Sequence, residues 1–299
     1  MTLFASSFQR KLPLYAQKAL QLGGGITAFH PITLPAGEII PTGLRDYTPG
    51  DDPRRIDWGI CARHDELRVK EFRGKTVHHA YFLLDTSRSM HVGPQKFNLA
   101  RESLMVLAYT LLRQHSSISV LCWDKNQSKN HILLSLSGVS RLGKLMKFLE
   151  NTAITSQKTD FCQTAQDFTS FPFPKGSIFI ISDFFGQTDS FEKNYTPGLI
   201  HLQEAGFFPH LIHITSCTDR GENMRGDVII EDVESGYRQS ITLTERDIRA
   251  YQKLYLRYVE SIPTFCRRRK IRYTQVSTEM KQDEACLAAL GIPHGTGIQ

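Results

Sequence analysis

The sequence predicts an α/β fold of three layers, in which a mostly parallel central sheet lies between helices on both of its faces. From residue 79 onward, short apolar runs alternate with amphipathic segments, and this alternation is typical of parallel strands joined by helical crossovers. Two of the apolar runs, Ala80–Leu84 and Ser177–Ser182, lead directly into a carboxylate, Asp85 or Asp183. Each run is therefore expected to be a buried strand with a polar group at its carboxyl end.

Composition supports a folded globular protein. The chain has 299 residues, of which 40% are hydrophobic and 22% are charged, enough for one large domain with an appendage. The net charge of +6 favours acidic partners, but it is too diffuse to predict nucleic-acid binding. The six cysteines are scattered without a C-x-x-C pair, which is typical of reduced thiols in the cytosol.

The sequence predicts neither a transmembrane segment nor a signal peptide. No apolar run approaches the roughly 20 residues that are needed to cross a bilayer. Gln9, Arg10 and Lys11 interrupt the apolar core that a signal peptide would need. We therefore expect a cytoplasmic protein.

Residues 1–29 should form an N-terminal helix followed by a hinge. Apolar side chains recur close to helical spacing over residues 3–22, and Gly23–Gly25 then breaks the pattern. Packing of this helix on its own domain is favoured over docking on a membrane surface or a partner, because the helix carries little charge.

Residues 30–76 are rich in proline, glycine and charge, and we expect them to form an irregular extension packed on the main domain. The sequence Pro49-Gly50-Asp51 predicts a tight turn. The surrounding arginines and aspartates predict planar salt bridges around a half-buried Trp58. The residues expected to serve structure or interaction are Arg45, Tyr47, Pro49, Gly50, Asp51, Asp52, Arg54, Asp57, Trp58 and Arg63. Acid–base catalysis by the aspartates is the alternative, and ion pairing is favoured.

Residues 77–292 should form the main domain. The segments expected as strands are 80–84, 117–123, 130–136 (at an edge), 177–182, 207–215 and 271–273. The segments expected as helices are 95–114, 139–149, a helix that follows the polar loop 155–160 and ends near 170, and 196–205. In the first of these helices, for example, Phe97, Ala100 and Leu104 share one face.

The C-terminal part adds a hairpin and a long helix. Two β-rich segments, 225–230 and 237–243, flank Glu234-Ser235-Gly236 and predict a β-hairpin. Thr244, followed three residues later by Asp247, resembles a capping box and opens a helix that runs through Ile262. The run Arg267–Lys270 is best explained as the solvated end of this helix, where the helix dipole favours cations, and phosphate binding is the alternative.

The end of the first apolar run predicts a candidate metal site. Asp85, Ser87 and Ser89 occupy alternate positions, so their side chains could converge, and oxygen ligands of this kind suit a hard cation. Asp183 and Thr159 are expected on the same rim, because ligands of parallel sheets bind at the carboxyl ends of strands. The competing interpretation is that these residues only cap and turn the chain after a strand.

These residues resemble known families. The series Asp85-Thr86-Ser87-Arg88-Ser89, then Thr159, then Asp183 is similar to the metal-ion-dependent adhesion site of von Willebrand factor A domains. The block from Arg45 to Trp58, with Ala62 and Arg63, resembles the bacterial "domain of unknown function 58" family. The predicted hairpin and the helix around Tyr251 resemble it too, so the likeness covers roughly residues 37–290.

The resemblance implies a Rossmann-type, von Willebrand A-like domain that binds Mg²⁺, Mn²⁺ or Ca²⁺. Ser87 and Ser89 would be direct ligands, Asp85 and Asp183 would act largely through water, and Thr159 would join them when a partner is bound. A carboxylate of the partner would take the open position. Proteins similar to this one are often encoded beside MoxR-type AAA+ ATPases and are thought to be adaptors in maturation or assembly.

The chain departs from its relatives in two places. Lys158 precedes Thr159 where relatives more often have glycine, and the N-terminal membrane helices of many relatives are missing. We expect a metal-dependent protein-interaction module rather than an enzyme, with a MoxR-type ATPase or its client as the partner. The alternatives are a metal-assisted hydrolase using Asp85 and Asp183, and a nucleic-acid-binding protein using residues 267–272.

Overall fold

A computed structural model of the chain describes residues 4–22, 39–64, 66–74, 78–92, 94–123, 132–153, 160–186, 190–221, 226–231 and 238–292. The chain divides into two compact units. Unit 1 comprises Met1–Phe29 and His79–Gln299, and unit 2 comprises His30–His78. The N-terminal segment therefore belongs to the same unit as the large C-terminal region. Packing of the extension on the main domain stays a prediction.

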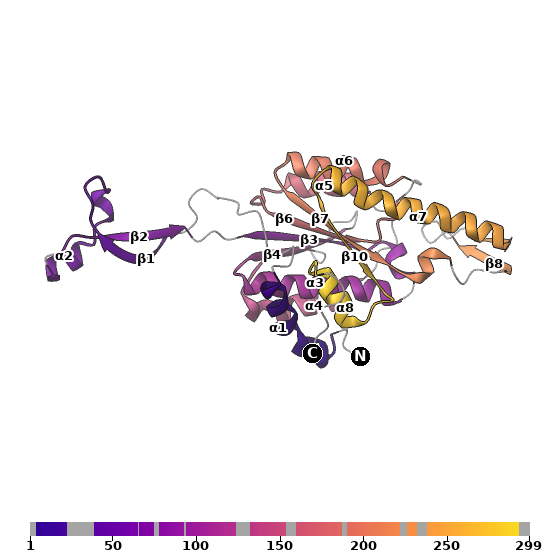
Figure 1. Ribbon diagram of the computed structural model, residues 1–299, viewed down its shortest axis with the longest axis horizontal. Helices are drawn as coiled ribbons and strands as arrows, with labels where there is room; N and C mark the ends of the chain where they lie inside the picture. The colour runs from indigo at the N-terminus through magenta and orange to yellow at the C-terminus, as the bar shows by residue number, and fades with distance from the viewer. Residues whose placement is uncertain are drawn as a thin grey trace. The chain divides into compact units, whose positions relative to one another are not determined.

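The centre of unit 1 is a six-stranded sheet in the order β10-β7-β6-β3-β4-β5 (Figure 1). Its strands are β3 (His79–Asp85), β4 (Ser117–Trp123), β5 (Ile132–Ser137), β6 (Ser177–Ser182), β7 (Phe208–Thr215) and β10 (Arg272–Ser277). All neighbours are parallel except β5, which pairs with β4 in the antiparallel sense at one edge. The predicted fold class and the predicted edge strand are both confirmed.

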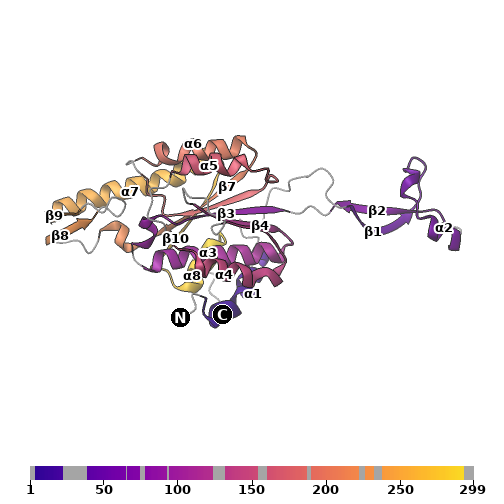
Figure 2. The ribbon, with the colours of Figure 1, turned by 180° about the vertical axis from the view of Figure 1, so that it is seen from behind.

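Helices cover both faces of this sheet (Figures 1 and 2). The helices on one face are α1 (Ser6–Gln21), α3 (Pro94–Arg113), α4 (Leu142–Asn151) and α8 (Gln282–Ala289). The helices on the other face are α5 (Phe161–Ser170), α6 (Phe191–Glu204) and α7 (Glu245–Arg268). Short 3-10 turns lie at η2 (Arg88–His91), η4 (Val139–Arg141) and η5 (Cys217–Arg220).

Strand β3 shows why the sheet is buried on both sides. Phe82 and Leu84 contribute to the core under α3, whereas Tyr81 and Leu83 contribute to the core under α5 and α6. Successive side chains of a strand point to opposite faces, so a continuous apolar run fills both cores. Each such side chain contributes about 1.5–3 kcal/mol when it is fully buried.

The strand order places a topological switch point at the centre of the sheet. From β3 the chain moves outward through β4 to β5, and from β6 it moves the opposite way through β7 to β10. Strands β3 and β6 are parallel neighbours, with Leu84 beside Ile181. Their carboxyl ends therefore open at the same edge, where Asp85 and Asp183 lie.

Helix α1 packs on unit 1, as the favoured interpretation predicted. Phe8, Leu12 and Tyr15 are buried in the same core as α3 and α8. The Tyr15 hydroxyl also donates a hydrogen bond to Asp283 Oδ1 at 2.5 Å, and Lys11 forms a salt bridge with the same carboxylate at 2.8 Å. The predicted hinge Gly23–Gly25 lies outside the described residues.

Two helices differ from the prediction. Helix α6 begins at Phe191 rather than near residue 196, so Pro197 and Gly198 lie in the interior of the helix and not in its first turn. A Cβ on Gly198 would approach Phe161 Cδ1 to 2.7 Å, so glycine permits α6 to lie close to α5. Helix α8 was not predicted at all.

The predicted pairing of two β-rich segments and the predicted capping box are confirmed, and the predicted turn Glu234-Ser235-Gly236 lies outside the described residues. Strands β8 (Gly226–Glu231) and β9 (Arg238–Leu243) pair in the antiparallel sense. The Thr244 hydroxyl then accepts a hydrogen bond from the Asp247 amide, while Asp247 accepts one from the Thr244 amide. This reciprocal cap begins α7, whose last turn carries Arg267 and Arg268.

Unit 2 is more regular than the predicted irregular extension. Strands β1 (Ile39–Asp46) and β2 (Arg68–Gly74) form an antiparallel pair, and η1 (Pro53–Arg55) and α2 (Trp58–His64) lie between them in sequence. The register shifts between Pro41 and Gly43. A proline cannot donate a hydrogen bond to a ladder, so such an irregularity lets a strand contain one.

Two further observations concern the whole chain. All six cysteines are free, as their scattered spacing predicted. Among the helices of the described ranges, none is both long and apolar enough to span a membrane.

Candidate functional site at the carboxyl edge of the sheet

The two predicted carboxylates meet at the carboxyl edge of the sheet, where β3 and β6 end. The Ser182 hydroxyl, on the last residue of β6, donates a hydrogen bond to Asp85 Oδ2 at 2.5 Å. Asp85 and Asp183 are only 2% and 1% exposed. Both groups therefore lie at one edge, as the sequence predicted, although they are beneath the surface.

The loop after β3 is held by its own polar side chains. Asp85 Oδ1 accepts a hydrogen bond from the Ser87 amide at 2.9 Å, and the Ser87 and Ser89 hydroxyl oxygens are 2.9 Å apart. The Thr86 hydroxyl donates to the carbonyl oxygen of Trp123 at 3.0 Å and ties the loop to β4. Asp85, Ser87 and Ser89 therefore converge as predicted, and their hydrogen bonds also turn the chain into η2.

A lysine that sequence analysis missed lies within this cluster. Lys96, in the first turn of α3, is 1% exposed. Its ammonium donates to Asp183 Oδ2 at 3.1 Å and to Asp219 Oδ1 at 2.6 Å. A longer hydrogen bond of 3.4 Å reaches the carbonyl oxygen of Ser89, in the predicted metal-binding loop.

Asp219 is the second residue that was missed. It lies in η5, just after the carboxyl end of β7. A carboxylate is therefore found at the carboxyl ends of β3, β6 and β7, and not only at those of β3 and β6 as the sequence predicted. Asp219 Oδ2 accepts a hydrogen bond from the Ser216 amide at 2.8 Å, which fixes its other oxygen toward Lys96. The Ser-x-x-Asp pattern of this capping box is the sequence signal for the turn.

Burial and charge shift the acid–base properties of the cluster. Burial, together with the nearby Asp183 carboxylate, raises the pKa of Asp85 to about 6. Burial opposes the charged form of Lys96, but Asp183 and Asp219 more than offset this effect and raise the pKa of its ammonium. Lys96 is thus a buried, charged group with two anionic partners.

The predicted Mg²⁺ site can be compared with this arrangement. Carboxylate and hydroxyl oxygens are suitable ligands for a hard cation. However, both oxygens of Asp85 accept protein hydrogen bonds, the two serine hydroxyls contact each other, and Asp183 already contacts an ammonium. The residues as arranged do not fit a divalent ion. In the described parts of the chain, no group of three or more His, Cys, Asp or Glu side chains is placed to hold a metal.

Thr159, the fifth predicted ligand, lies outside the described residues. The neighbouring Asp160 is described and caps α5 by accepting a hydrogen bond from the Cys162 amide at 2.8 Å. Asp160, the last residue of the predicted polar loop, therefore opens the third helix, and residues 155–159 lie outside the described residues.

In unit 2, part of the predicted salt-bridge block is present. Arg45 forms a two-pronged salt bridge with Asp51, with N–O distances of 2.7 and 2.5 Å. The Arg45 guanidinium, and next the Thr48 amide, hold the pKa of Asp51 well below its usual range. The turn Thr48-Pro49-Gly50-Asp51 is closed by a hydrogen bond from the Asp51 amide to the Thr48 carbonyl at 3.0 Å.

Other residues of the block have different roles from those predicted. Trp58 is 62% exposed, so the prediction of a half-buried indole is wrong. Asp52 caps η1 by accepting from the Arg54 amide, and Asp57 accepts from the Gly59 and Ile60 amides at the start of α2. These short side chains bond to local backbone, which draws them away from the tryptophan.

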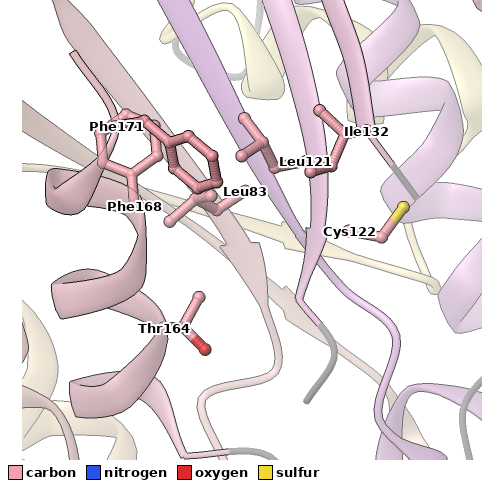
Figure 3. A pocket seen from close by; sticks show the side chains of 7 residues that line it. All are labelled: Leu83, Leu121, Cys122, Ile132, Thr164, Phe168 and Phe171. Carbon is pink, nitrogen blue, oxygen red and sulfur yellow. The ribbon is translucent and has the colours of Figure 1, made fainter. Parts of the chain in front are cut away.

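A small pocket lies between α5 and the β3–β4–β5 side of the sheet (Figure 3). Its lining residues are Leu83, Leu121, Cys122, Ile132, Thr164, Phe168 and Phe171. Figure 3 shows the two phenylalanine rings beside Leu83 and Leu121. Most of the lining is apolar, and the pocket shares no residue with the polar cluster.

Comparisons with known proteins give weak structural likenesses. BatB from Bacteroides thetaiotaomicron is 14% identical, with 67% of this chain and 90% of that chain covered and a TM-score of 0.35. An aerotolerance-related membrane protein from Bacteroides fragilis is 13% identical, with 71% and 98% covered and a TM-score of 0.37. A von Willebrand factor type A protein from Catenulispora acidiphila is 10% identical, with 72% and 41% covered and a TM-score of 0.36.

These likenesses carry no functional weight at such scores, and no curated protein matches the chain in sequence. A protein-family model does match: that of the proteins of unknown function DUF58, over residues 43–258. The matched region contains the Arg45–Asp51 salt bridge of unit 2 as well as the Asp85, Lys96, Asp183 and Asp219 cluster of unit 1. Because the match covers well over half of the chain, the protein belongs to the DUF58 family.

Proposed function

We propose that this chain is a protein-interaction module whose partner binds at the carboxyl edge of the sheet. The observation that carries the proposal is the construction of this edge. A buried polar cluster holds the loop 86–92 in place, and the loop presents partly exposed Arg88 and Ser89, followed by exposed His91 and Val92. Rigidly supported loops at a topological switch point are common binding surfaces in α/β folds.

The chemistry of the rim favours an acidic partner. Arg88, which precedes Ser89 in the sequence, supplies a positive charge to this loop, and the formal net charge of the chain is +6. The resemblance described above implies a MoxR-type AAA+ ATPase, or a client of it, as the partner, and we propose this class. Mg²⁺ dependence, which the sequence predicted, is not part of this proposal, because the residues as arranged at this edge do not fit a divalent ion.

The two alternative functions have less support. A hydrolase using Asp85 and Asp183 would require the substrate to reach them, but these side chains are 2% and 1% exposed and already accept hydrogen bonds. Nucleic-acid binding would use Arg267–Lys270, which are exposed at the end of α7. That helix end precedes β10, so it lies at the amino edge of the sheet, opposite the loop 86–92.

A matched pair of charge reversals tests the proposal. The purified chain is immobilised, and binding of a purified MoxR-type ATPase from the same source is measured by surface plasmon resonance. We expect Arg88→Glu to weaken binding by about tenfold or more, because a central interface arginine contributes at least about 1.4 kcal/mol. Arg268→Glu makes the same chemical change at the opposite edge and should leave binding within about twofold.

The melting temperature of each variant is measured as well, so that binding is compared only between folded proteins; Arg268 is exposed and its reversal should shift the melting temperature by no more than about 2 °C. If Arg268→Glu loses binding while Arg88→Glu binds fully, the interface lies at the amino edge of the sheet and the proposal is refuted. Equal binding by both variants and the wild type would also contradict it.

A further inference from the structure

The ammonium of Lys96 occupies the centre of the polar cluster. It has three N–H donors, and three oxygens surround it: Asp183 Oδ2 at 3.1 Å, Asp219 Oδ1 at 2.6 Å and the Ser89 carbonyl at 3.4 Å. The side chains of Lys96, Asp183 and Asp219 are 1%, 0% and 5% exposed. A buried cation with this many oxygen partners is a constructed site rather than a chance surface contact.

The oxygens around the ammonium are partly those that a metal ion was expected to use. Asp183 is one of the two carboxylates in the predicted metal site, and Ser89 belongs to its loop. The Phe185 ring closes another side of the cluster, with its centroid 5.5 Å from the Lys96 nitrogen. The lysine therefore performs locally what a bound cation would do, because it neutralises buried carboxylates and links the loop to the ends of β6 and β7.

The remaining predicted ligands are engaged with each other. Asp85 accepts hydrogen bonds from Ser182 and Ser87 on its two oxygens, and Ser87 and Ser89 share one hydrogen bond. These contacts hold the loop without a ligand. They satisfy these polar groups within the protein, while Lys96 places a positive charge near them.

We propose that Lys96 is the permanent cation of this site and takes the place of the divalent metal that the Asp-x-Ser-x-Ser pattern predicts. The carboxyl edge then keeps its shape in the absence of metal. Removal of the ammonium should leave Asp183 and Asp219 as a buried, uncompensated pair that recruits a divalent ion. This inference is independent of the proposed function, because metal binding is measured on the protein alone.

The test compares wild type with Lys96→Met, which keeps the length of the side chain and removes the charge. Binding of Mn²⁺ is measured by electron paramagnetic resonance, binding of Mg²⁺ by calorimetry, and thermal melting with and without EDTA. We expect wild type to bind neither ion saturably and to melt at the same temperature in 5 mM Mg²⁺ and in EDTA, to within about 1 °C. Lys96→Met should bind one Mn²⁺ at least about tenfold more tightly than wild type and should be stabilised by it.

Three controls make the result specific. Lys144→Met removes an exposed lysine of α4 and should behave like wild type. Adding Asp183→Asn to Lys96→Met should abolish the acquired Mn²⁺ binding, which locates the ion. If Lys96→Met does not fold, Lys96→Met with Asp219→Asn removes one of the uncompensated carboxylates and is tested for Mn²⁺ in its place.

Two outcomes would overturn the inference. Saturable Mg²⁺ or Mn²⁺ binding by wild type, lost in Asp183→Asn, would show that the metal binds despite the lysine. A folded Lys96→Met that takes up no ion would show that the site has no capacity for a metal that Lys96 could replace, and so would a folded Lys96→Met with Asp219→Asn that takes up none where the single variant does not fold.

Discussion

Asp85 and Lys96 show how single side chains decide the character of the sheet edge. Asp85 faces inward and bonds to the Ser182 hydroxyl and the Ser87 amide, so it supports the loop instead of pointing to solvent. Lys96 lies one turn before Ala100, a position on the buried face of α3. A lysine on the buried face of a helix requires carboxylate partners. The position of Lys96 on that face was therefore the feature of the sequence that indicated a cation within the cluster.

His213 provides a prediction at the same scale. It is buried at the carboxyl end of β7, and its Nδ1 lies 2.8 Å from the Tyr273 hydroxyl. Burial lowers the pKa of His213 to about 4, with Asp183 opposing the shift and Lys96 adding to it. Since an unfolded histidine has a pKa near 6.5, the unfolded state binds more protons between pH 6.5 and pH 4.

The contribution of His213 to the free energy of unfolding should therefore fall as the pH drops from 6.5 toward 4, by at most about 3 kcal/mol, while the raised pKa of Asp85 acts in the opposite direction over much of the same interval. His213→Phe keeps a ring in the core and takes up no proton. Urea denaturation at several pH values should show the variant gaining stability relative to wild type as the pH drops through this interval. Parallel profiles for the two proteins would show that His213 is not the source of the loss.

At the scale of the elements, α1 gives a direct test of packing. Phe8 is 1% exposed and stacks on Phe4, with ring centroids 5.8 Å apart, whereas Leu20 of the same helix is 48% exposed. We expect Phe8→Ala to lower the free energy of unfolding by about 3–5 kcal/mol, because it removes a large buried ring and leaves a cavity. Leu20→Ala should change it by less than about 0.5 kcal/mol.

The measurement is urea denaturation followed by circular dichroism, with both variants in the same background. The helical propensities of leucine and alanine are close, so Leu20→Ala also controls for the effect of a new alanine in the helix. Equal stabilities for Phe8→Ala and Leu20→Ala would mean that α1 does not dock on α3 and α8.

The elements that the sequence predicted well have strong local patterns. The apolar runs of β3 and β6 and the capping box of α7 could be recognised because their residue types repeat at the period of the element. Helix α8 was missed because it is short and buries a block of consecutive residues, Ala285–Ala289, rather than one face. Strands β1 and β2 were missed because Pro41 and the surrounding charges interrupt the alternation that marks a strand.

The site could be predicted only in part for a related reason. Asp85 and Asp183 follow buried strands directly, so their meeting at one edge follows from the parallel sheet. Lys96 and Asp219 are 123 residues apart, and only the fold brings them to 2.6 Å. An ion pair between residues so far apart in the sequence leaves no local pattern that a single sequence can show. A metal ion was therefore the simplest cation to predict as the partner of the carboxylates.

At the scale of the whole molecule, the two units differ in how much core they contain. Unit 1 has a buried core on each face of its sheet, whereas the buried apolar residues of unit 2 include Ile56 and Val69 beside a two-stranded ladder. A two-stranded sheet is at best marginally stable by itself in water. Unit 1 should therefore fold without unit 2, and unit 2 should not fold alone.

Excision tests this asymmetry. Residues 30–78 are replaced by a flexible Gly/Ser linker of about 20 residues, and the same residues are produced as a separate peptide. The excised protein should melt cooperatively within about 5 °C of the full chain, because both cores and helix α1 remain, while the peptide should show the circular dichroism of an unfolded chain. An excised protein that aggregates or melts without cooperativity would show that unit 1 depends on unit 2. In that case the family match, which begins at residue 43 within unit 2, would describe one folding unit rather than two.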